Sequence, residues 1–214
     1  MPERSRKDNR HGQGFGQRQR PPRAACQQRP EFQPGSYYHI FNRGAHQRSI
    51  FKDNENYLFV VRKIKQYSSQ FHHTIIAYCL IPNHYHLLVR QDGNFKASML
   101  PQQVFNSYTK AYNKRYDHSG TLFEDSFHIK IIQDTSHLLH LCRYIHGNPV
   151  KDGFVADPAD WEYSNYREFI GTRNGSLFDP GFFTEFFSDR KDYREFAFDD
   201  LSSRNLPDSI RNYL

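Results

Sequence analysis

The chain has 214 residues, of which 37% are hydrophobic and 16% aromatic, enough for one domain with an extension but not for two well-developed domains. Its formal charge of +6 favours polyanionic partners, of which nucleic acid is the commonest. Three widely spaced cysteines without a CxxC pair exclude a disulfide framework, and no run approaches the roughly 18 apolar residues of a membrane span. We therefore expect a cytoplasmic, nucleoid-associated protein with no membrane partner.

The first part of the chain differs in composition from the rest. Residues 1–33 are rich in Gln, Arg, Gly and Pro and contain few hydrophobic residues, so they cannot bury enough surface to offset chain entropy. Residues 1–30 carry eight Lys and Arg against two acidic residues, which is the whole formal excess of positive charge. We predict a disordered basic tail over 1–33, which is either an arm along phosphates or a solvated tail.

Strand and helix patterns alternate through the middle of the chain. β-Branched and aromatic runs predict strands, and apolar residues at helical spacing predict helices. The predicted elements are strands at 37–41, 73–80, 84–90 and 127–133, and helices at 53–70 and 97–116. This order, β-α-β-β-α-β, is typical of the ferredoxin-like α+β folds.

A further helix is predicted at 135–148, with a cap near Asp134 and an end at Pro149. This added helix follows the four-stranded sheet. Residues 173–214 give only weak helical signals. We therefore expect one folded domain over 34–172, followed by a C-terminal extension over 173–214 that is weakly structured or helical. The apolar stripe of the added helix consists of Leu138, Leu141, Cys142 and Ile145.

Two histidines share one face of the strand predicted at 84–90. Alternation along a strand directs His84 and His86 to one side, and Tyr85 and Leu87 to the other. Two imidazoles on one face can share a divalent ion, and a polar residue on an interior strand needs a partner. Because the chain contains twelve histidines, the spacing alone also fits an incidental pair.

Tyr144 is a candidate nucleophile on the added helix. On a helical wheel it lies at the polar edge of the apolar stripe, with His137, His140 and Asn148 seven, four and four residues away. A neighbouring base such as His140 could activate its hydroxyl. A boundary tyrosine with a packed ring fits the same position. The rival tyrosines on the preceding helix are Tyr108, Tyr112 and Tyr116, of which the first two lie on its apolar stripe.

Several short blocks together resemble a known family over roughly residues 37–169. The blocks are IPNHYHLLV at 81–89, NKR at 113–115, GTLF at 120–123, RYIHGNPV at 143–150 and WEYS at 161–164. In order and spacing they resemble the REP-associated tyrosine transposases, HUH-type relatives of the single-tyrosine transposases of bacterial insertion sequences. Each block is weak alone, but their joint occurrence is highly specific.

The resemblance implies a metal-dependent transposase that cleaves and rejoins single-stranded DNA hairpins. His84 and His86 would bind Mg²⁺ or Mn²⁺, and Asn148 would complete the metal site. Tyr144 would attack the phosphodiester and form a 5′-phosphotyrosine. REP-like palindromes are the implied partners, and the protein would be a monomer or a homodimer. The residues assigned to DNA binding are Arg43, Lys114, Arg115, Lys130 and Arg143.

Two other functions fit parts of this pattern. A nucleic-acid-binding regulator could retain the same scaffold without cleaving DNA, although a pure binder needs neither the two histidines nor Tyr144. An unrelated metal-dependent hydrolase could use His84 and His86, but it would release its product without a covalent adduct. Formation of a denaturation-resistant protein–DNA adduct distinguishes the transposase from both.

Removal of residues 1–30 tests the role of the basic tail. Because counterion release dominates binding by a cationic arm, the truncated protein should bind hairpins and unrelated single strands with similarly reduced affinity and a flatter salt dependence. Cleavage at saturating DNA should persist. Affinity measured against salt concentration decides between the two interpretations, since equal slopes for the full-length and truncated proteins would identify a solvated tail.

Overall fold

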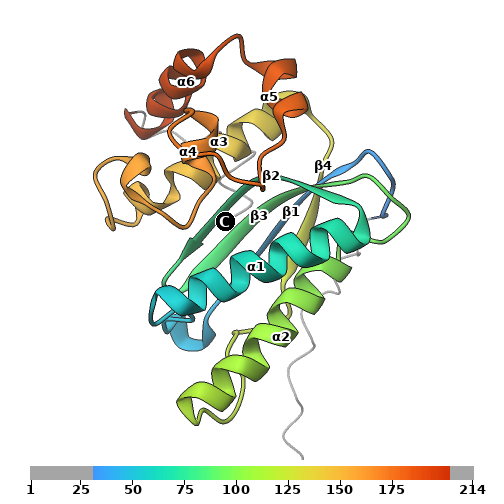
Figure 1. Ribbon diagram of the computed structural model, residues 1–214, viewed down its shortest axis with the longest axis vertical. Helices are drawn as coiled ribbons and strands as arrows, with labels where there is room; N and C mark the ends of the chain where they lie inside the picture. Colours follow the sequence, from blue (N-terminus) through green and yellow to red (C-terminus); the bar gives the residue numbers. More distant parts are fainter. Residues whose placement is uncertain (1–30, 203–214) are drawn as a thin grey trace, which may run out of the picture.

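The computed structural model describes residues 31–202 (Figure 1). The predicted tail over 1–33 therefore lies outside the described residues except for its last three, and the same is true of 203–214 at the other end. The strands are β1 (Tyr37–Arg43), β2 (His73–Ile81), β3 (His84–Gln91) and β4 (His128–Ile132). The helices are α1 (Asn54–Phe71), α2 (Met99–Tyr116), α3 (Thr135–Lys151), α4 (Tyr166–Phe169), α5 (Pro180–Phe186) and α6 (Arg190–Ser202), with 3₁₀ turns η1 (Ala45–Gln47) and η2 (Pro158–Asp160).

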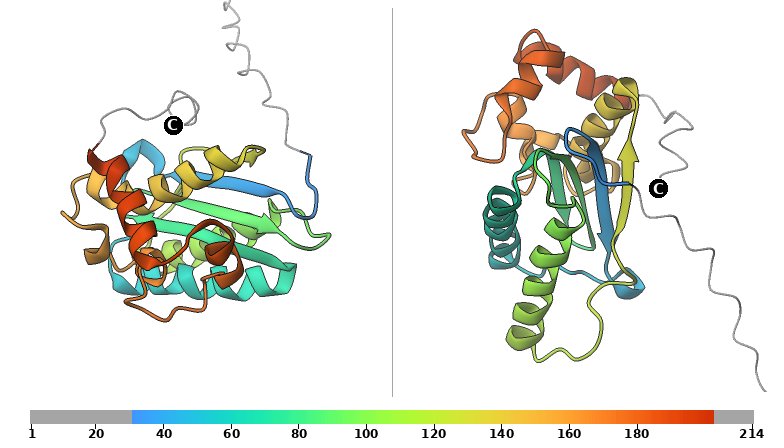
Figure 2. Two further views of the ribbon diagram at one scale, coloured as in Figure 1. Left: turned by 90° about the horizontal axis from the view of Figure 1, so that it is seen from above. Right: turned by 90° about the vertical axis from the view of Figure 1, so that its right-hand side faces the viewer.

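The four strands form one sheet in the order β2-β3-β1-β4, and each neighbouring pair is antiparallel. Helices α1 and α2 cover one face of the sheet, and α3 with the elements that follow it covers the other (Figures 1 and 2). This confirms the predicted α+β fold with an added helix after β4. Among residues 31–202, no helix is long and apolar enough to cross a membrane.

Helix caps lie where the sequence predicts them. The Asp53 side chain accepts a hydrogen bond from the backbone N–H of Asn56 at the start of α1, and Asp134 does the same for His137 at the start of α3. Each cap satisfies a backbone donor that has no partner within the helix. The two helices therefore begin at fixed points relative to the strands before them.

The predicted end of the added helix at Pro149 is wrong. Helix α3 continues through Pro149 to Lys151, and the backbone N–H of Asp152 still donates to the carbonyl of Asn148. Proline removes one backbone donor, but tertiary packing can offset that loss, and Pro149 is itself buried. Asn148 consequently lies inside the helix, with only 2% of its surface exposed.

Each face of the sheet packs against its own hydrophobic core. Tyr85, Leu87 and Val89 of β3 contribute to the core under α1 and α2, as their alternation predicts. Leu88 faces the second core, which lies under α3. The two histidines at the start of β3 share the face of Leu88, so α3 lies over them.

The second core extends beyond residue 172. Phe182 and Phe183 of α5 and Tyr193 of α6 are almost fully buried and pack with Phe169. Their rings lie 4.6 to 6.5 Å from the Phe169 ring, centroid to centroid. In the described part of the extension, aromatic side chains therefore attach α5 and α6 to α3 and α4.

Asn165 connects three parts of this second layer. Its Oδ1 accepts a hydrogen bond from the backbone N–H of Tyr78 and lies 2.9 Å from Nε2 of His146. Its Nδ2 donates to the carbonyls of Ile76 and Leu177. Asn165 is fully buried, so these contacts replace all of its hydration and attach the 161–177 segment to edge strand β2 and to α3.

Asn165→Ala should lower the free energy of unfolding by about 2 to 4 kcal/mol, because it leaves several buried groups without partners at about 1–3 kcal/mol each. Urea denaturation of the two proteins measures the difference. Asn174→Ala is the matched control, since Asn174 is exposed in the same segment. A loss no larger than that of the control would contradict the bridging role of Asn165.

Candidate functional site

Strand β3 and helix α3 together position the candidate site. His84 and His86 lie on the α3 side of β3, with ring centroids 5.0 Å apart and planes nearly perpendicular. His86 is 5% exposed, whereas His84 is half-buried. Because β3 is an interior strand, hydrogen bonds to both neighbouring strands fix the separation of the two rings.

Both ring nitrogens of His84 have polar neighbours. Nδ1 lies 3.0 Å from Oδ1 of Asn83, and Nε2 lies 3.0 Å from Oδ1 of Asn148 on α3. Oδ2 of Asp152, one turn beyond Asn148, is 3.9 Å from the same Nε2. Burial lowers the pKa of His84 below its ordinary value of 6.5, although Asp152 and Asn148 act in the opposite direction. His84 is therefore neutral at pH 7, the form in which imidazole binds a metal.

His86 bonds to a histidine that the sequence analysis did not single out. Its Nδ1 lies 3.0 Å from Nε2 of His39 on β1. Burial lowers the pKa of His39 to about 3 and that of His86 well below 6.5, so both rings are neutral. If Nδ1 of His86 donates to His39, then Nε2 of His86 keeps its lone pair for a ligand.

Tyr144 packs over this histidine pair. Its ring centroid is 5.7 Å from that of His86, and the two planes are nearly perpendicular. Nζ of Lys151 lies 4.6 Å from the centre of the Tyr144 ring. Tyr144 is only 6% exposed, so its predicted position at the polar edge of the helix does not leave it at the surface. The helical wheel predicted only which side of the helix faces the hydrophobic core. In the structure, α3 also buries its polar edge, which packs against the histidines of the sheet.

Two of the predicted DNA-binding residues lie beside the site. Arg43 pairs with His84 in the β1–β3 register, is exposed, and forms an ion pair with Glu124. Lys130 pairs with His39 in the β1–β4 register, and its Nζ is 5.7 Å from the centre of the Phe41 ring. The structure therefore brings two cationic side chains to the same face of the sheet as the histidines.

The other predicted basic residues lie elsewhere. Lys114 and Arg115 are exposed at the end of α2, and Arg115 pairs with Asp53 at 2.7 Å. The guanidinium of Arg143 stacks on the Phe196 ring at 4.6 Å and donates to the Phe196 carbonyl. The His140 ring also lies beside Phe196, with centroids 6.1 Å apart. Arg143 and His140 thus both contact Phe196 of α6. The role of His140 as the base for Tyr144 stays a prediction.

The side chains around His84 fit a divalent ion through a mixed donor set. In the described part of the chain, no three His, Cys, Asp or Glu side chains are grouped as a metal site. Instead, an amide oxygen of Asn148 lies 3.0 Å from Nε2 of His84, and the His84 ring lies beside that of His86. Nitrogen and oxygen donors of this kind suit Mn²⁺ and, less well, Mg²⁺. Three protein ligands would leave coordination positions for phosphate oxygens.

Comparison with known proteins adds independent information. The chain matches the family described as "Transposase IS200 like" over residues 33–148. It is 31% identical over 117 residues to a Haemophilus influenzae protein named as a REP-associated tyrosine transposase, covering 50% of this chain and 66% of that protein, just under two thirds of its length. A solved structure of a REP-associated tyrosine transposase bound to a REP hairpin superposes with a TM-score of 0.59 at 20% identity, over 71% of this chain and 92% of the other, which establishes similarity of fold.

Calorimetric titration with Mn²⁺ tests the metal site directly. We expect binding to the full chain and a loss of affinity of at least about tenfold in His84→Ala and in His86→Ala, because each removes a ligand. His128→Ala is the control, since it removes an exposed histidine from the same sheet at β4. Unchanged affinity in both site variants would show that the pair does not bind the ion.

Proposed function

Because the chain belongs to the family of IS200-like transposases, we propose that it binds single-stranded DNA hairpins and cleaves and rejoins them through a covalent tyrosine intermediate. The observation that carries this proposal is the position of Tyr144, packed over His86 in a site that also contains His84 and Asn148. A nucleophile beside phosphate-binding groups is what strand cleavage without ATP requires.

In the proposed reaction, the phenolic oxygen of Tyr144 attacks the scissile phosphorus. A tyrosine O–P bond forms on the 5′ side of the break while the bond from phosphorus to the 3′ oxygen breaks. The phenolic proton passes to solvent, and the departing 3′ oxygen takes up a proton and leaves as a hydroxyl. The number of phosphoester bonds is unchanged, so a different 3′-hydroxyl can attack the phosphotyrosine and complete strand transfer.

The other residues of the site bind and orient the phosphate. A divalent ion, Mg²⁺ or Mn²⁺, held by His84, His86 and Asn148 would supply positive charge to the phosphate oxygens. His39 holds the ring of His86 in one orientation. Arg43, which is exposed beside His84, is placed to contact the DNA backbone on either side of the break.

The proposed partners are hairpins of REP-like sequence. The support is indirect and comes from the fold, since the solved structure with the same fold contains a REP hairpin. Hairpins with flanking single strands give the active site an unpaired segment to cleave. We propose that the protein acts on them as a monomer or a homodimer.

Tyr144→Phe should reduce cleavage of a labelled REP-like hairpin in the presence of Mn²⁺ by at least about a thousandfold, because it removes only the attacking oxygen. Hairpin affinity and thermal stability should change little. Gel electrophoresis under denaturing conditions shows whether the covalent protein–DNA adduct forms.

Tyr67→Phe on α1 is the matched control for this experiment, because it removes a hydroxyl from the opposite face of the sheet. Adduct formation should be retained in this control. If wild-type protein binds the hairpin but forms no adduct under any metal condition, the regulator is the better interpretation. Cleavage without an adduct would instead favour a metal-dependent hydrolase.

A further inference from the structure

A second cationic hollow lies outside the candidate active site. It has a volume of about 440 Å³ and lies between the segment that follows β1 and the C-terminal end of α2. This volume is in the range of small-ligand sites. Its lining includes His46, Arg48, Ser49, Lys52, Ser119 and Thr121. We refer to it as the β1–α2 pocket.

The lining of the β1–α2 pocket has the chemistry of an anion site. It contains the cations Arg48 and Lys52, both exposed, and the hydroxyls of Ser49, Ser119 and Thr121, but no carboxylate. Hydroxyl donors combined with Arg and Lys are the groups that contact phosphate oxygens in nucleic-acid complexes. The pocket therefore offers both positive charge and neutral hydrogen-bond donors to an anion.

Contacts with α2 hold Lys52 at the pocket. Its Nζ lies 4.3 Å from the ring centre of Tyr116 and 5.2 Å from that of Tyr112. Asp53, the next residue, is not available to neutralise it, because its carboxylate pairs with Arg115 and accepts a hydrogen bond from Tyr116. The aromatic rings thus position Lys52 at the lining of the pocket, without a carboxylate among the lining residues.

The backbone that carries this pocket is unusual. His46 and Gln47 both have positive φ, 55° and 58°, which residues other than glycine seldom adopt. A Cβ at Gly44 would lie 2.1 Å from the carbonyl oxygen of Arg48, so only glycine allows the chain to fold back this tightly. The tight fold brings His46 and Arg48 to the same hollow, and local strain of this kind is concentrated at functional sites.

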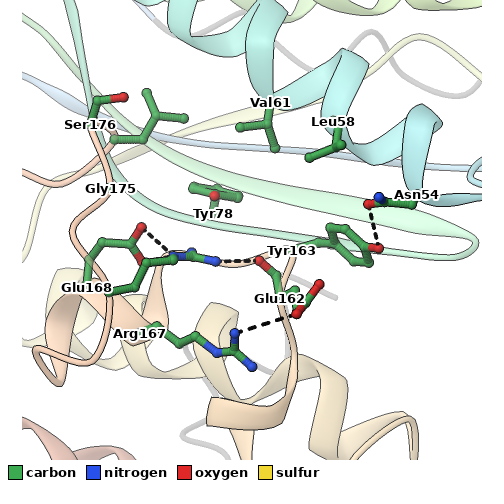
Figure 3. A pocket seen from close by; sticks show the side chains of 12 residues that line it. Asn54, Leu58, Val61, Tyr78, Glu162, Tyr163, Arg167, Glu168, Gly175 and Ser176 are labelled. Carbon is green, nitrogen blue, oxygen red and sulfur yellow. Dashed lines mark hydrogen bonds and ion pairs between the residues drawn. The ribbon is translucent and has the colours of Figure 1, made fainter.

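A comparable pocket elsewhere lacks the positive charge. It has a volume of about 450 Å³ and lies between α1 and the 162–177 segment (Figure 3). Arg173 there pairs with Glu168 at 2.8 Å, and Arg167 lies 3.8 Å from Glu162. Each arginine is matched by a carboxylate, so this pocket offers an anion no net charge. Of these two hollows, the β1–α2 pocket is the one suited to phosphate.

The β1–α2 pocket is connected to the strand of the candidate site. The backbone N–H of Gly44 donates to the carbonyl of Asn83, and those of Ile50 and Phe51 donate to that of Pro82. Asn83 immediately precedes His84 and contacts its ring. The pocket and the candidate site therefore lie at the same end of the sheet, with their segments joined at the β2–β3 turn.

We propose that the β1–α2 pocket binds a backbone phosphate of the DNA strand on which the protein acts, at a point away from the scissile bond. The inference deepens the proposed function, because it assigns the pocket to the same substrate. Its position at the end of the sheet that carries His84 favours the DNA backbone over a free phosphate compound. The contact is with phosphate and not with a base, so it is insensitive to DNA sequence.

The test compares two double variants that remove the same charge. Arg48→Gln with Lys52→Gln alters the pocket, and Arg62→Gln with Lys65→Gln removes two cations from the exposed side of α1. Both are made in full-length Tyr144→Phe protein. Binding of a fluorescent 20-nucleotide oligo-dT strand is measured from 50 to 300 mM KCl. Inorganic phosphate and dTMP serve as competitors.

The pocket variant should bind about tenfold more weakly at 100 mM KCl. The slope of log affinity against log salt concentration should fall by about 0.7, the value for one phosphate contact on a single strand. The α1 variant should change both quantities far less. Equal losses in the two variants would overturn the proposal, because net charge alone would explain them. Competition by dTMP or phosphate at micromolar concentration would also overturn it, in favour of a free phosphate ligand.

Thr121→Val provides a second measurement if the double variant does not fold. It removes one hydroxyl donor without a change in charge and should weaken binding by about threefold, in the range of a single hydrogen bond. No change in affinity would contradict the phosphate contact. The experiment needs no cleavage, so failure of Tyr144 to form an adduct in the wild type would refute the proposed reaction and leave this result standing.

Discussion

The rest of the site depends on the burial of two imidazoles on an interior strand. His84 and His86 face α3 beside a hydrophobic core, and a buried polar group without a partner costs about 1–3 kcal/mol. The fold meets this constraint from both sides: Asn148 on α3 contacts His84, and His39 on β1 contacts His86. The same contacts orient the ring nitrogens, so stability and the proposed metal binding depend on one arrangement.

That constraint explains why α3 continues past its proline. If the helix ended at Pro149, Asn148 would leave the helical path and its amide would not be held over His84. In the observed helix, Tyr144 and Asn148 are four residues apart on the side that faces the histidines, and Asp152, which caps the helix, follows four residues later. One missing backbone hydrogen bond is a small loss against the buried contacts of this side. The spacing also places the proposed nucleophile and the proposed ligand on successive turns.

Much of this could be predicted from the sequence, and the limits are physical. Alternation and helical spacing located the strands, the first helices and the shared face of His84 and His86, because these patterns follow from backbone geometry. The burial of Tyr144 could not be predicted, since a helical wheel does not show what a helix packs against. The position of His39 could have been predicted. It alternates along β1 with buried Tyr38 and Ile40, and the predicted fold places β1 beside β3. Charge alone could not show that Arg143 packs against α6 while Lys130 lies beside the site. The contact of Arg143 with Phe196 forms only in the tertiary structure.

The two faces of the sheet differ in what they offer a nucleic acid. The α3 face presents the buried ring of His86, the half-buried ring of His84 and a buried tyrosine, which suit the proposed chemistry on one phosphate. The end of the α2 face presents exposed cations and hydroxyls, which suit sequence-independent retention of the backbone. The β2–β3 turn links them: the carbonyls of Pro82 and Asn83 bind the segment after β1, and the next residue is His84. A DNA strand held in the β1–α2 pocket would therefore lie at the same end of the sheet as the histidines, and these backbone hydrogen bonds connect the segment that binds it with the segment that carries His84.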